Sequence, residues 1–396
     1  MLDRNIVRYH FLYLFIFLSP FVNNINGFMM KFYSFSFVGP LFYAISFLFF
    51  GFNILLYRKK EVLLIILGLF FYFLILVLTN RSPFSSFVVY IKLINPIIIY
   101  FYVRHMVFDK DKMKKIIQVM ILSAVLYSSF IVLSVLTGFT YYEGKGYIGA
   151  IHAINALTMY YLVVFFFLSI LKRSVSNSEL FIFVAYVLIK SKTILIFMPI
   201  YIYRLFKYVL KNWSLGFRLL GFFGGIIFSY KYFYEWFILK FQQSFIDLYS
   251  MRDLFFYYTL DQVLNFLTFG RWTIWLLVLQ NYNKTFLDVI IGSGYYGAKY
   301  LTGGKIGIEM DVLNAFNVYG MVGVFLIFLF YYVPIFKFKI SNYSKLLFFV
   351  VLVSAFFGGH LAVGPIANTM YGVVLGLLYN NDKKLVGEFF EIRNGD

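Results

Sequence analysis

The chain has 396 residues, of which 62% are hydrophobic and only 13% are charged, and its mean hydropathy is +0.82. Soluble proteins carry about a quarter charged residues, so this composition excludes a soluble globular protein and indicates a polytopic membrane protein. The net charge of +18 is then typical of cytoplasmic topology signals and lipid-headgroup contacts, and we expect no nucleic-acid partner.

Apolar runs along the whole chain predict an all-α fold of about twelve transmembrane helices. A run of about 18 apolar residues is long enough to cross about 30 Å of hydrocarbon as a helix. The first run follows Arg4 and Arg8 like a signal peptide, but it lacks a small-residue cleavage site, so we interpret it as an uncleaved span. The short run 179–190 either forms a span of its own or continues into 193–210 as one bent helix. The predicted ranges are 9–26, 35–57, 61–79, 87–103, 116–137, 148–171, 179–190, 193–210, 215–233, 311–336, 345–359 and 362–380.

The basic residues predict the orientation of these spans. Cytoplasmic connections are enriched in Lys and Arg, and 22 of the 35 basic residues fall in the two termini and in one set of alternate connections. We therefore expect both termini to be cytoplasmic. The short connections on the opposite, external side hold only Lys31, Arg81, Lys145, Lys190 and Lys192.

Residues 231–310 interrupt the pattern of spans, because no run in them qualifies as a good membrane helix. The segment is rich in aromatic and aliphatic residues, which is the wrong composition for disorder. Within it, residues 271–283 have apolar side chains at helical spacing interrupted by polar ones, as in an interfacial helix. The sequence thus predicts a single membrane domain, 1–396, with one long folded loop, 231–310, on the external face.

Basic side chains are rare on the external side, and they are the expected ligands for a phosphate group. The external arginines are Arg81, Arg252 and Arg271, and Lys192 lies at the outer end of a predicted helix. The alternative role for each is an interfacial anchor or a contact with lipid phosphate. For Arg271 we favour ligand binding, because it begins the amphipathic stretch and a guanidinium fork suits a pyrophosphate.

A glycine turn and a few titratable residues follow Arg271. Gly292 and Gly294 flank a serine without the strand and helix context of a nucleotide-binding motif, so a turn with positive φ is the default interpretation. Glu309 and Asp311 precede an apolar run, where Asp311 alternatively caps the helix that begins near it. His360 lies between the last two spans and titrates near neutral pH. No recognised spacing of metal ligands occurs, and the chain has no cysteine, so we expect no metal site.

The order of these features resembles that of the O-antigen polymerase and ligase superfamily, bacterial membrane glycosyltransferases. The resemblance covers roughly residues 180–370. The Glu309-x-Asp311 pair is similar to the polymerase (Wzy-type) branch, whereas ligases have His-Asn where this chain has Glu-Met, and Lys192 departs from the usual arginine. The corresponding motifs are Ser191-Lys192, Arg271, Gly292-Ser293-Gly294, Glu309 and Gly320-Met321-Val322-Gly323.

The resemblance implies an enzyme of the bacterial inner membrane with its active site on the periplasmic side. Its donor and acceptor would be glycans linked to undecaprenyl pyrophosphate, its surroundings membrane lipids, and a chain-length regulator is a common partner in the family. No cofactor is expected. The leaving pyrophosphate needs fixed cations, for which Arg271 and Lys192 are the first candidates and Arg252 and Arg81 the next. The acceptor hydroxyl needs a base, for which the order of preference is Glu309, Asp311 and His360.

Two other functions remain as alternatives. An O-antigen ligase shares the ordered motifs, but the absent His-Asn pair disfavours it. A flippase or transporter for lipid-linked oligosaccharide shares the many spans, yet it typically has charges within its spans and repeated halves. In this chain Lys92 is the one strong charge within a predicted span, and no repeated halves are visible.

Overall fold

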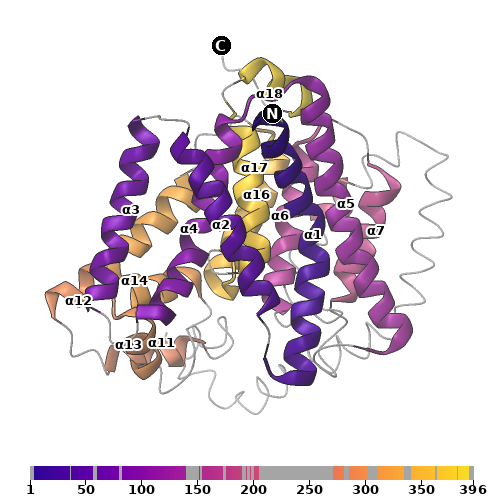
Figure 1. Cartoon of the computed structure of the whole chain (residues 1–396). Helices are drawn as coiled ribbons and strands as arrows, with labels where there is room; N and C mark the ends of the chain where they lie inside the picture. Colours follow the sequence, from indigo (N-terminus) through magenta and orange to yellow (C-terminus); the bar gives the residue numbers. More distant parts are fainter. Residues whose placement is uncertain are drawn as a thin grey trace. The chain divides into compact units, whose positions relative to one another are not determined.

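A computed structural model of the chain shows a helical protein (Figure 1). The structure describes residues 4–35, 37–56, 60–79, 83–139, 151, 154–172, 175–189, 193, 197, 200–204, 271–280, 285–301, 310–333, 340–361, 364–380 and 382–391. Extended pairing between two described residues is limited to one antiparallel bridge, Leu171 to Phe390, and Ile340 is a further isolated bridge residue. The all-α prediction is therefore confirmed for this part of the chain.

The helices follow the apolar runs of the sequence. Ten of the twelve predicted ranges coincide with helices, while 215–233 and most of 193–210 lie outside the described residues. The helices are α1 (Arg4–Tyr33), α2 (Val38–Leu56), α3 (Lys60–Thr79), α4 (Pro83–His105), α5 (Lys110–Thr137), α6 (Ile154–Ile170), α7 (Asn177–Leu188), α11 (Arg271–Gln280), α12 (Phe286–Ile291), α13 (Gly294–Leu301), α14 (Asp311–Ile327), the π-helix η2 (Phe328–Tyr332), α16 (Asn342–Gly358), α17 (Pro365–Leu378) and α18 (Lys383–Phe389).

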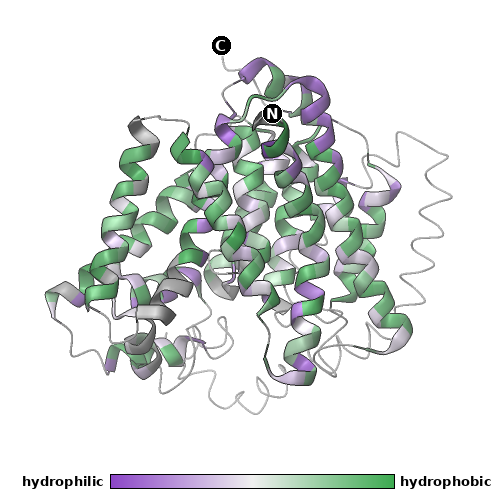
Figure 2. Ribbon diagram, in the orientation of Figure 1, coloured by the Kyte–Doolittle hydropathy of each residue, from purple (hydrophilic) through white to green (hydrophobic). Residues whose placement is uncertain are grey.

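Four of the described helical segments are long and apolar enough to cross a membrane: Ile6–Tyr33, Val38–Leu56, Lys110–Thr137 and Asp311–Tyr332. Most of the helical ribbon in Figure 2 has the colour of hydrophobic residues, and hydrophilic residues gather on α18 and on the first turns of α5. The long segment 231–310 is folded where the structure describes it, because α11, α12 and α13 lie within it.

The chain forms two compact units, 1–193 together with 274–396, and 194–273. In the second unit, the described residues are 197, 200–204 and the first three residues of α11. The contacts described below lie within the first unit. Whether the chain functions as a single membrane domain stays a prediction.

The parallel pair α4 and α17 forms the centre of the first unit. Small or amide residues recur every fourth position along one side of α17, at Gly364, Asn368, Gly372, Gly376 and Asn380. Such a stripe lets two backbones approach closely. A Cβ atom on Gly372 would lie 2.6 Å from the Pro96 carbonyl oxygen of α4, so only glycine fits there.

Two asparagines of this stripe donate to backbone carbonyl groups of α4 and of Met106, just beyond it. Pro96 has no N–H, so the carbonyl of Lys92, four residues earlier, loses its usual hydrogen bond. Asn368 Nδ2 donates to that oxygen over 2.8 Å. At the C-terminal end of α4, Asn380 Nδ2 donates to the carbonyls of Val103, Arg104 and Met106. Both side chains are buried, and each meets the hydrogen-bond demand of backbone that lies away from water.

A buried polar cluster joins α1 to α2 and α5. Asn23 Nδ2 donates to the hydroxyls of Tyr43 and Tyr127 over 2.9 and 2.8 Å, and Ser19 Oγ lies 3.0 Å from the Tyr127 hydroxyl. Interhelical hydrogen bonds of this kind help hold membrane helices together, because burial against other helices supplies little hydrophobic driving force in lipid.

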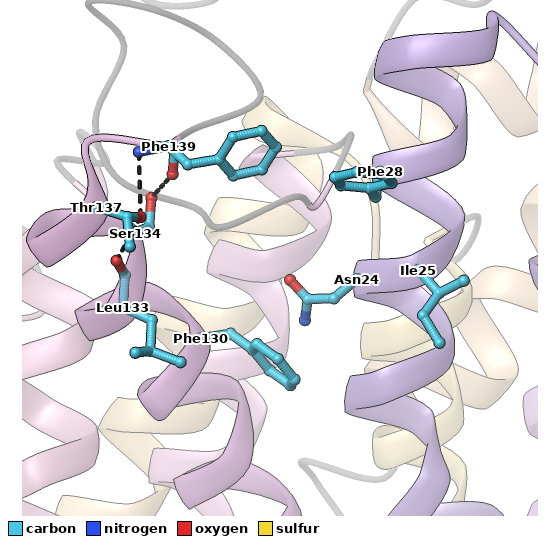
Figure 3. Close-up of a pocket in the computed structure, with 8 residues that line it drawn as sticks. All are labelled: Asn24, Ile25, Phe28, Phe130, Leu133, Ser134, Thr137 and Phe139. Carbon is cyan, nitrogen blue, oxygen red and sulfur yellow. Dashed lines mark hydrogen bonds between the residues drawn. The ribbon is translucent and has the colours of Figure 1, made fainter.

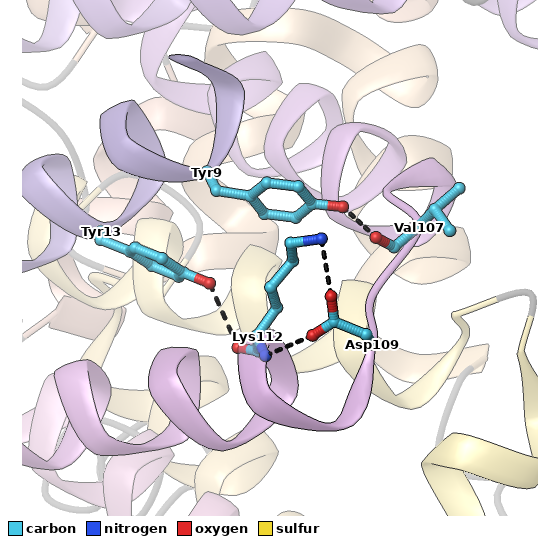
Figure 4. A network of polar contacts seen from close by, with 5 residues as sticks. All are labelled: Tyr9, Tyr13, Val107, Asp109 and Lys112. Atoms are coloured by element: carbon cyan, nitrogen blue, oxygen red, sulfur yellow. Dashed lines mark hydrogen bonds and ion pairs between the residues drawn. The ribbon is translucent and has the colours of Figure 1, made fainter. Parts of the chain in front are cut away.

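The turn between α4 and α5 is held by side chains from α1 and by its own N-cap (Figure 4). Asp109 caps α5, accepting the Lys112 backbone N–H over 2.8 Å and pairing with Lys112 Nζ over 2.7 Å. Tyr9 donates to the Val107 carbonyl, and Tyr13 donates to the Lys112 carbonyl over 3.2 Å. The hydrogen bonds from Lys112 lower the pKa of the Asp109 carboxyl.

Candidate functional site

Helix α14 is broken at Gly320, and this break is the centre of the candidate site. The residue has φ 65° and ψ −159°, which are not helical angles, although helix continues on both sides. Irregular backbone within a membrane-length helix is tolerated only where it is buried in protein or lines a cavity. Helices interrupted in this way are also common at substrate sites of membrane proteins.

The break in α14 interlocks with the turn between α12 and α13. A Cβ atom on Gly320 would lie 2.4 Å from the Ile290 carbonyl oxygen, and one on Gly292 would lie 2.3 Å from the Val318 carbonyl oxygen. Gly292 and Gly294 have φ 85° and 63°, as the sequence predicted for this turn. The two glycine motifs, 28 positions apart in the chain, therefore touch backbone to backbone.

Carbonyl groups beside the break find partners outside α14. The Ser293 backbone N–H donates to the Asn317 carbonyl over 3.0 Å. The buried Tyr72 hydroxyl, on α3, lies 2.6 Å from the Tyr319 carbonyl and 3.4 Å from the Ile291 carbonyl. Because these partners come from the glycine turn and from α3, the irregular backbone is held in one arrangement.

Asp311 clamps the first turn of α14 to the loop between α16 and α17. Its carboxylate oxygens accept the backbone N–H groups of His360 and Leu361 over 2.8 and 2.9 Å, and the side chain is only 3% exposed. The N-cap of α14 is Met310, and no side chain forms a cap hydrogen bond there. The helix begins where the sequence predicted, but the Asp311 carboxylate holds a distant loop, which is a positioning role.

His360 lies in a strained part of that loop. Its φ of 74° falls in the left-handed region, which is uncommon for a residue other than glycine. Asp311 accepts its N–H, and its carbonyl accepts the Gly364 N–H over 3.2 Å just before α17 begins. Strained backbone of this kind persists where surrounding contacts over-determine it, often at functional sites.

Several buried polar atoms near the break have no protein partner among the described residues. They are the Asn317 amide oxygen and nitrogen, the Ser293 hydroxyl oxygen and the Asn314 amide oxygen. Asn317 is fully buried, and its backbone bonds to that of Ser293. A buried amide without a partner costs about 1–3 kcal/mol, so these groups are suited to a polar ligand.

Helix α11 packs over the start of α14. Its Val278 forms a small core with Leu301 and Met310, and the ring centroid of Trp275 lies 5.9 Å from that of Phe316. Met310 directly precedes Asp311, so this core anchors the chain at the start of α14. Arg271 is the first residue of α11, one turn before Trp275.

The structure places some of the predicted site residues and leaves others undescribed. It brings the Gly292–Gly294 turn to the α14 break and Asp311 to the His360 loop, and it places Arg271 on α11. The remaining predicted residues lie outside the described part of the chain: Glu309, Lys192, Arg252 and Arg81. Among described residues, no group of three His, Asp or Glu side chains is arranged to hold a metal ion.

Sequence reasoning missed two contributors to this region. Asn317 is an amide in an apolar helix, and this polarity was a usable signal. Tyr72 carries no such signal, because it is one of 35 tyrosines and only the packing of α3 against the break distinguishes it.

Comparison with known proteins adds no identification. No family model, curated protein or solved structure matches the chain.

Proposed function

We propose that the chain is a membrane glycosyltransferase that polymerises lipid-linked oligosaccharide repeat units on the periplasmic face of the bacterial inner membrane. The proposal includes about twelve spans, cytoplasmic termini and a donor linked to undecaprenyl pyrophosphate. The observation that carries it is the α14 break. The Gly-x-Gly turn and the Gly-x-x-Gly helix, which the sequence resemblance selects separately, meet there, on the helix that begins at Asp311.

The proposed reaction is displacement at the anomeric carbon of the donor glycan. The acceptor hydroxyl oxygen forms a bond to this carbon, the bond from carbon to pyrophosphate oxygen breaks, and undecaprenyl pyrophosphate leaves with the bonding electrons. Glu309 accepts the hydroxyl proton. Arg271, Lys192, Arg252 and Arg81 are the proposed cations that stabilise negative charge on the leaving group.

The contacts of Asp311 favour a positioning role over that of a base. Both of its carboxylate oxygens already accept backbone N–H groups, so proton transfer to it would weaken the clamp on the His360 loop. Glu309, two residues earlier, is therefore retained as the proposed base. Asn317 and Ser293, with polar atoms that have no described protein partner, are proposed to contact sugar hydroxyls.

Lys92 joins the proposed set of cations. Its carbonyl bonds to Asn368, one turn into α17 beyond the His360 loop, and α4 contacts both α13 and α17. Its side chain is exposed, although it lies within a predicted span. An ammonium group at that depth is costly unless it meets an anion or water, which makes it a candidate ligand for the pyrophosphate.

Glycan profiling of a strain that lacks the gene tests the proposal. The strain is complemented with wild type, Glu309→Gln or Arg271→Ala, with membrane abundance measured for each. Matched controls are Glu388→Gln, whose carboxylate pairs with Lys110 on the surface, and Lys384→Ala on α18. We expect wild type and controls to restore a long-chain ladder and the two site variants to leave a single repeat unit.

Two other outcomes would replace the proposal. Long chains that remain attached only to the carrier lipid would indicate a ligase. Failure of even one repeat unit to reach the outer face would indicate a flippase, for which a broken helix is also typical.

A further inference from the structure

A groove between α1 and α5 lies at the C-terminal ends of these two helices, away from the α14 break in sequence and in its contacts (Figure 3). Its volume is about 310 Å³. Ile25 and Phe28 line it from α1, Phe130 and Leu133 line it from α5, and Phe139 follows α5. Ile25, Phe28 and Leu133 are 50%, 46% and 51% exposed, so the groove opens on the outer surface of the helix pair.

The polar groups of the groove wall hydrogen-bond to nearby backbone. Asn24 Nδ2 donates to the Pro20 carbonyl over 2.9 Å, and the Thr137 hydroxyl donates to the Leu133 carbonyl over 2.7 Å. The Ser134 hydroxyl donates to the Phe139 carbonyl. With these donors occupied, the groove offers mainly hydrocarbon and aromatic surface, which suits an alkyl chain and not a sugar.

A cation lies at one end of the groove. Lys31 Nζ is 4.7 Å from the centroid of the Phe139 ring, and it belongs to the last turn of α1. The rings of Phe28 and Phe32 lie 6.0 and 5.9 Å from that of Phe139. An apolar groove that ends in aromatic rings and an ammonium group matches an amphiphile with an anionic head.

We propose that this groove binds one acyl chain of an anionic phospholipid, with the lipid phosphodiester beside Lys31. One ammonium group matches the single charge of a phosphodiester, whereas a pyrophosphate calls for several cations. The site is separate from the α14 break, and the proposal depends on membrane location but not on glycosyltransferase activity.

Native mass spectrometry of the purified full-length protein in detergent tests this site. Phosphatidylglycerol or phosphatidylcholine is added stepwise to delipidated protein. We expect one phosphatidylglycerol to bind more tightly than phosphatidylcholine. Lys31→Gln should reduce that preference about fivefold, the value of one basic residue near an anionic headgroup, and Leu133→Trp should remove binding by filling the groove.

Matched controls separate the groove from general lipid contact. Leu136→Trp adds the same ring on α5 at a residue that is 76% exposed and does not line the groove, and Lys345→Gln removes a charge at the start of α16. Both controls should bind lipid like wild type. Equal binding of the two lipids by wild type, an unchanged preference in Lys31→Gln, or equal losses in Leu133→Trp and Leu136→Trp would overturn the proposal. If undecaprenyl phosphate displaced phosphatidylglycerol from the groove, the groove would instead bind a carrier lipid, and the proposal would also be overturned.

Discussion

In both the α4–α17 pair and the α14 break, a backbone carbonyl loses its helical hydrogen-bond partner, and the two regions replace that partner in different ways. In α4, Pro96 deprives the Lys92 carbonyl of its partner, and the Asn368 side chain supplies one. In α14, Gly320 interrupts the helix, and the replacement donors are a backbone N–H from another turn and the Tyr72 hydroxyl. The first repair leaves a continuous helix, whereas the second leaves Asn317 buried without a described protein partner for its amide. Buried polar atoms without a described partner also occur in α4, at Asn95 and Arg104, but the Asn317 amide lies within three residues of irregular backbone, and this combination marks the candidate site.

The largest expected effect comes from filling the close contact at the break. Gly320→Ala places a Cβ atom 2.4 Å from the Ile290 carbonyl oxygen at a φ of 65°. Strain and overpacking together should lower the free energy of unfolding in mixed micelles by about 3 kcal/mol. Gly68→Ala in α3, where nothing lies within 4 Å, is the control. A Gly320→Ala protein as stable as this control would show that the two turns do not interlock.

Removing the charge of the Asp311 carboxylate, which holds the His360 loop, should have the next largest effect on the free energy of unfolding. Asp311→Asn keeps the shape but leaves one backbone N–H facing an amide nitrogen, which should cost about 2 kcal/mol of unfolding free energy. Asp382→Asn, at the N-cap of α18, controls for loss of a carboxylate that accepts a single N–H. If hydrogen exchange at the Leu361 amide is no faster in Asp311→Asn than in wild type, the clamp is not formed.

Asn368→Ala tests the α4–α17 pair. It leaves the Lys92 carbonyl without the side-chain donor, and we expect a loss of about 1 kcal/mol in unfolding free energy. Long-chain glycan should still form, because the effect is on scaffold. The neighbouring Thr369→Ala is the comparison, because it removes a hydroxyl that donates to Asn368 Oδ1 over 3.4 Å but leaves the Asn368 amide nitrogen that donates to the Lys92 carbonyl. If Asn368→Ala lost long-chain glycan at unchanged membrane abundance, Asn368 would have a role in the functional site and not only in the scaffold.

Asn317→Leu should give the opposite result. An apolar side chain of similar size removes a buried amide that has no described partner, so the unfolding free energy should stay unchanged or rise by about 1 kcal/mol. Long-chain glycan should nevertheless fall tenfold or more, as expected for the loss of at least one ligand hydrogen bond of about 1.4 kcal/mol. Unchanged glycan together with raised stability would make Asn317 a packing defect without function.

The smallest effect concerns the cap of α5, in the turn that follows α4. Folding lowers the pKa of Asp109, so its contribution to stability is present above the unfolded pKa of about 4 and is lost as pH falls through the lower folded value. Asp109→Asn should therefore flatten the acid limb of the stability profile slightly, since the side chain is 56% exposed. Asp111→Asn, in the same first turn, is the control. Identical acid limbs for wild type and Asp109→Asn would contradict the prediction.

Most of the described helices were predictable because a membrane-spanning helix satisfies its own backbone and needs only a sufficiently long apolar run. The glycine turn was predictable for a related reason, since positive φ is a local property of Gly292 and Gly294. The role of Asp311 was not. Its position at the start of a helix favoured a local cap, but its carboxylate accepts N–H groups 49 and 50 positions away in the chain.

The sequence by itself determined the membrane class, the positions of most described helices and the set of candidate residues, because hydrophobicity and backbone preference act over short stretches of chain. Only the tertiary structure decided which glycines touch, which carbonyl accepts the Asn368 amide, and that the buried Asn317 amide has no described hydrogen-bond partner. Those outcomes depend on packing between helices such as α4 and α17, which lie more than 250 positions apart in the chain. No local pattern of residues specifies which distant backbone will approach.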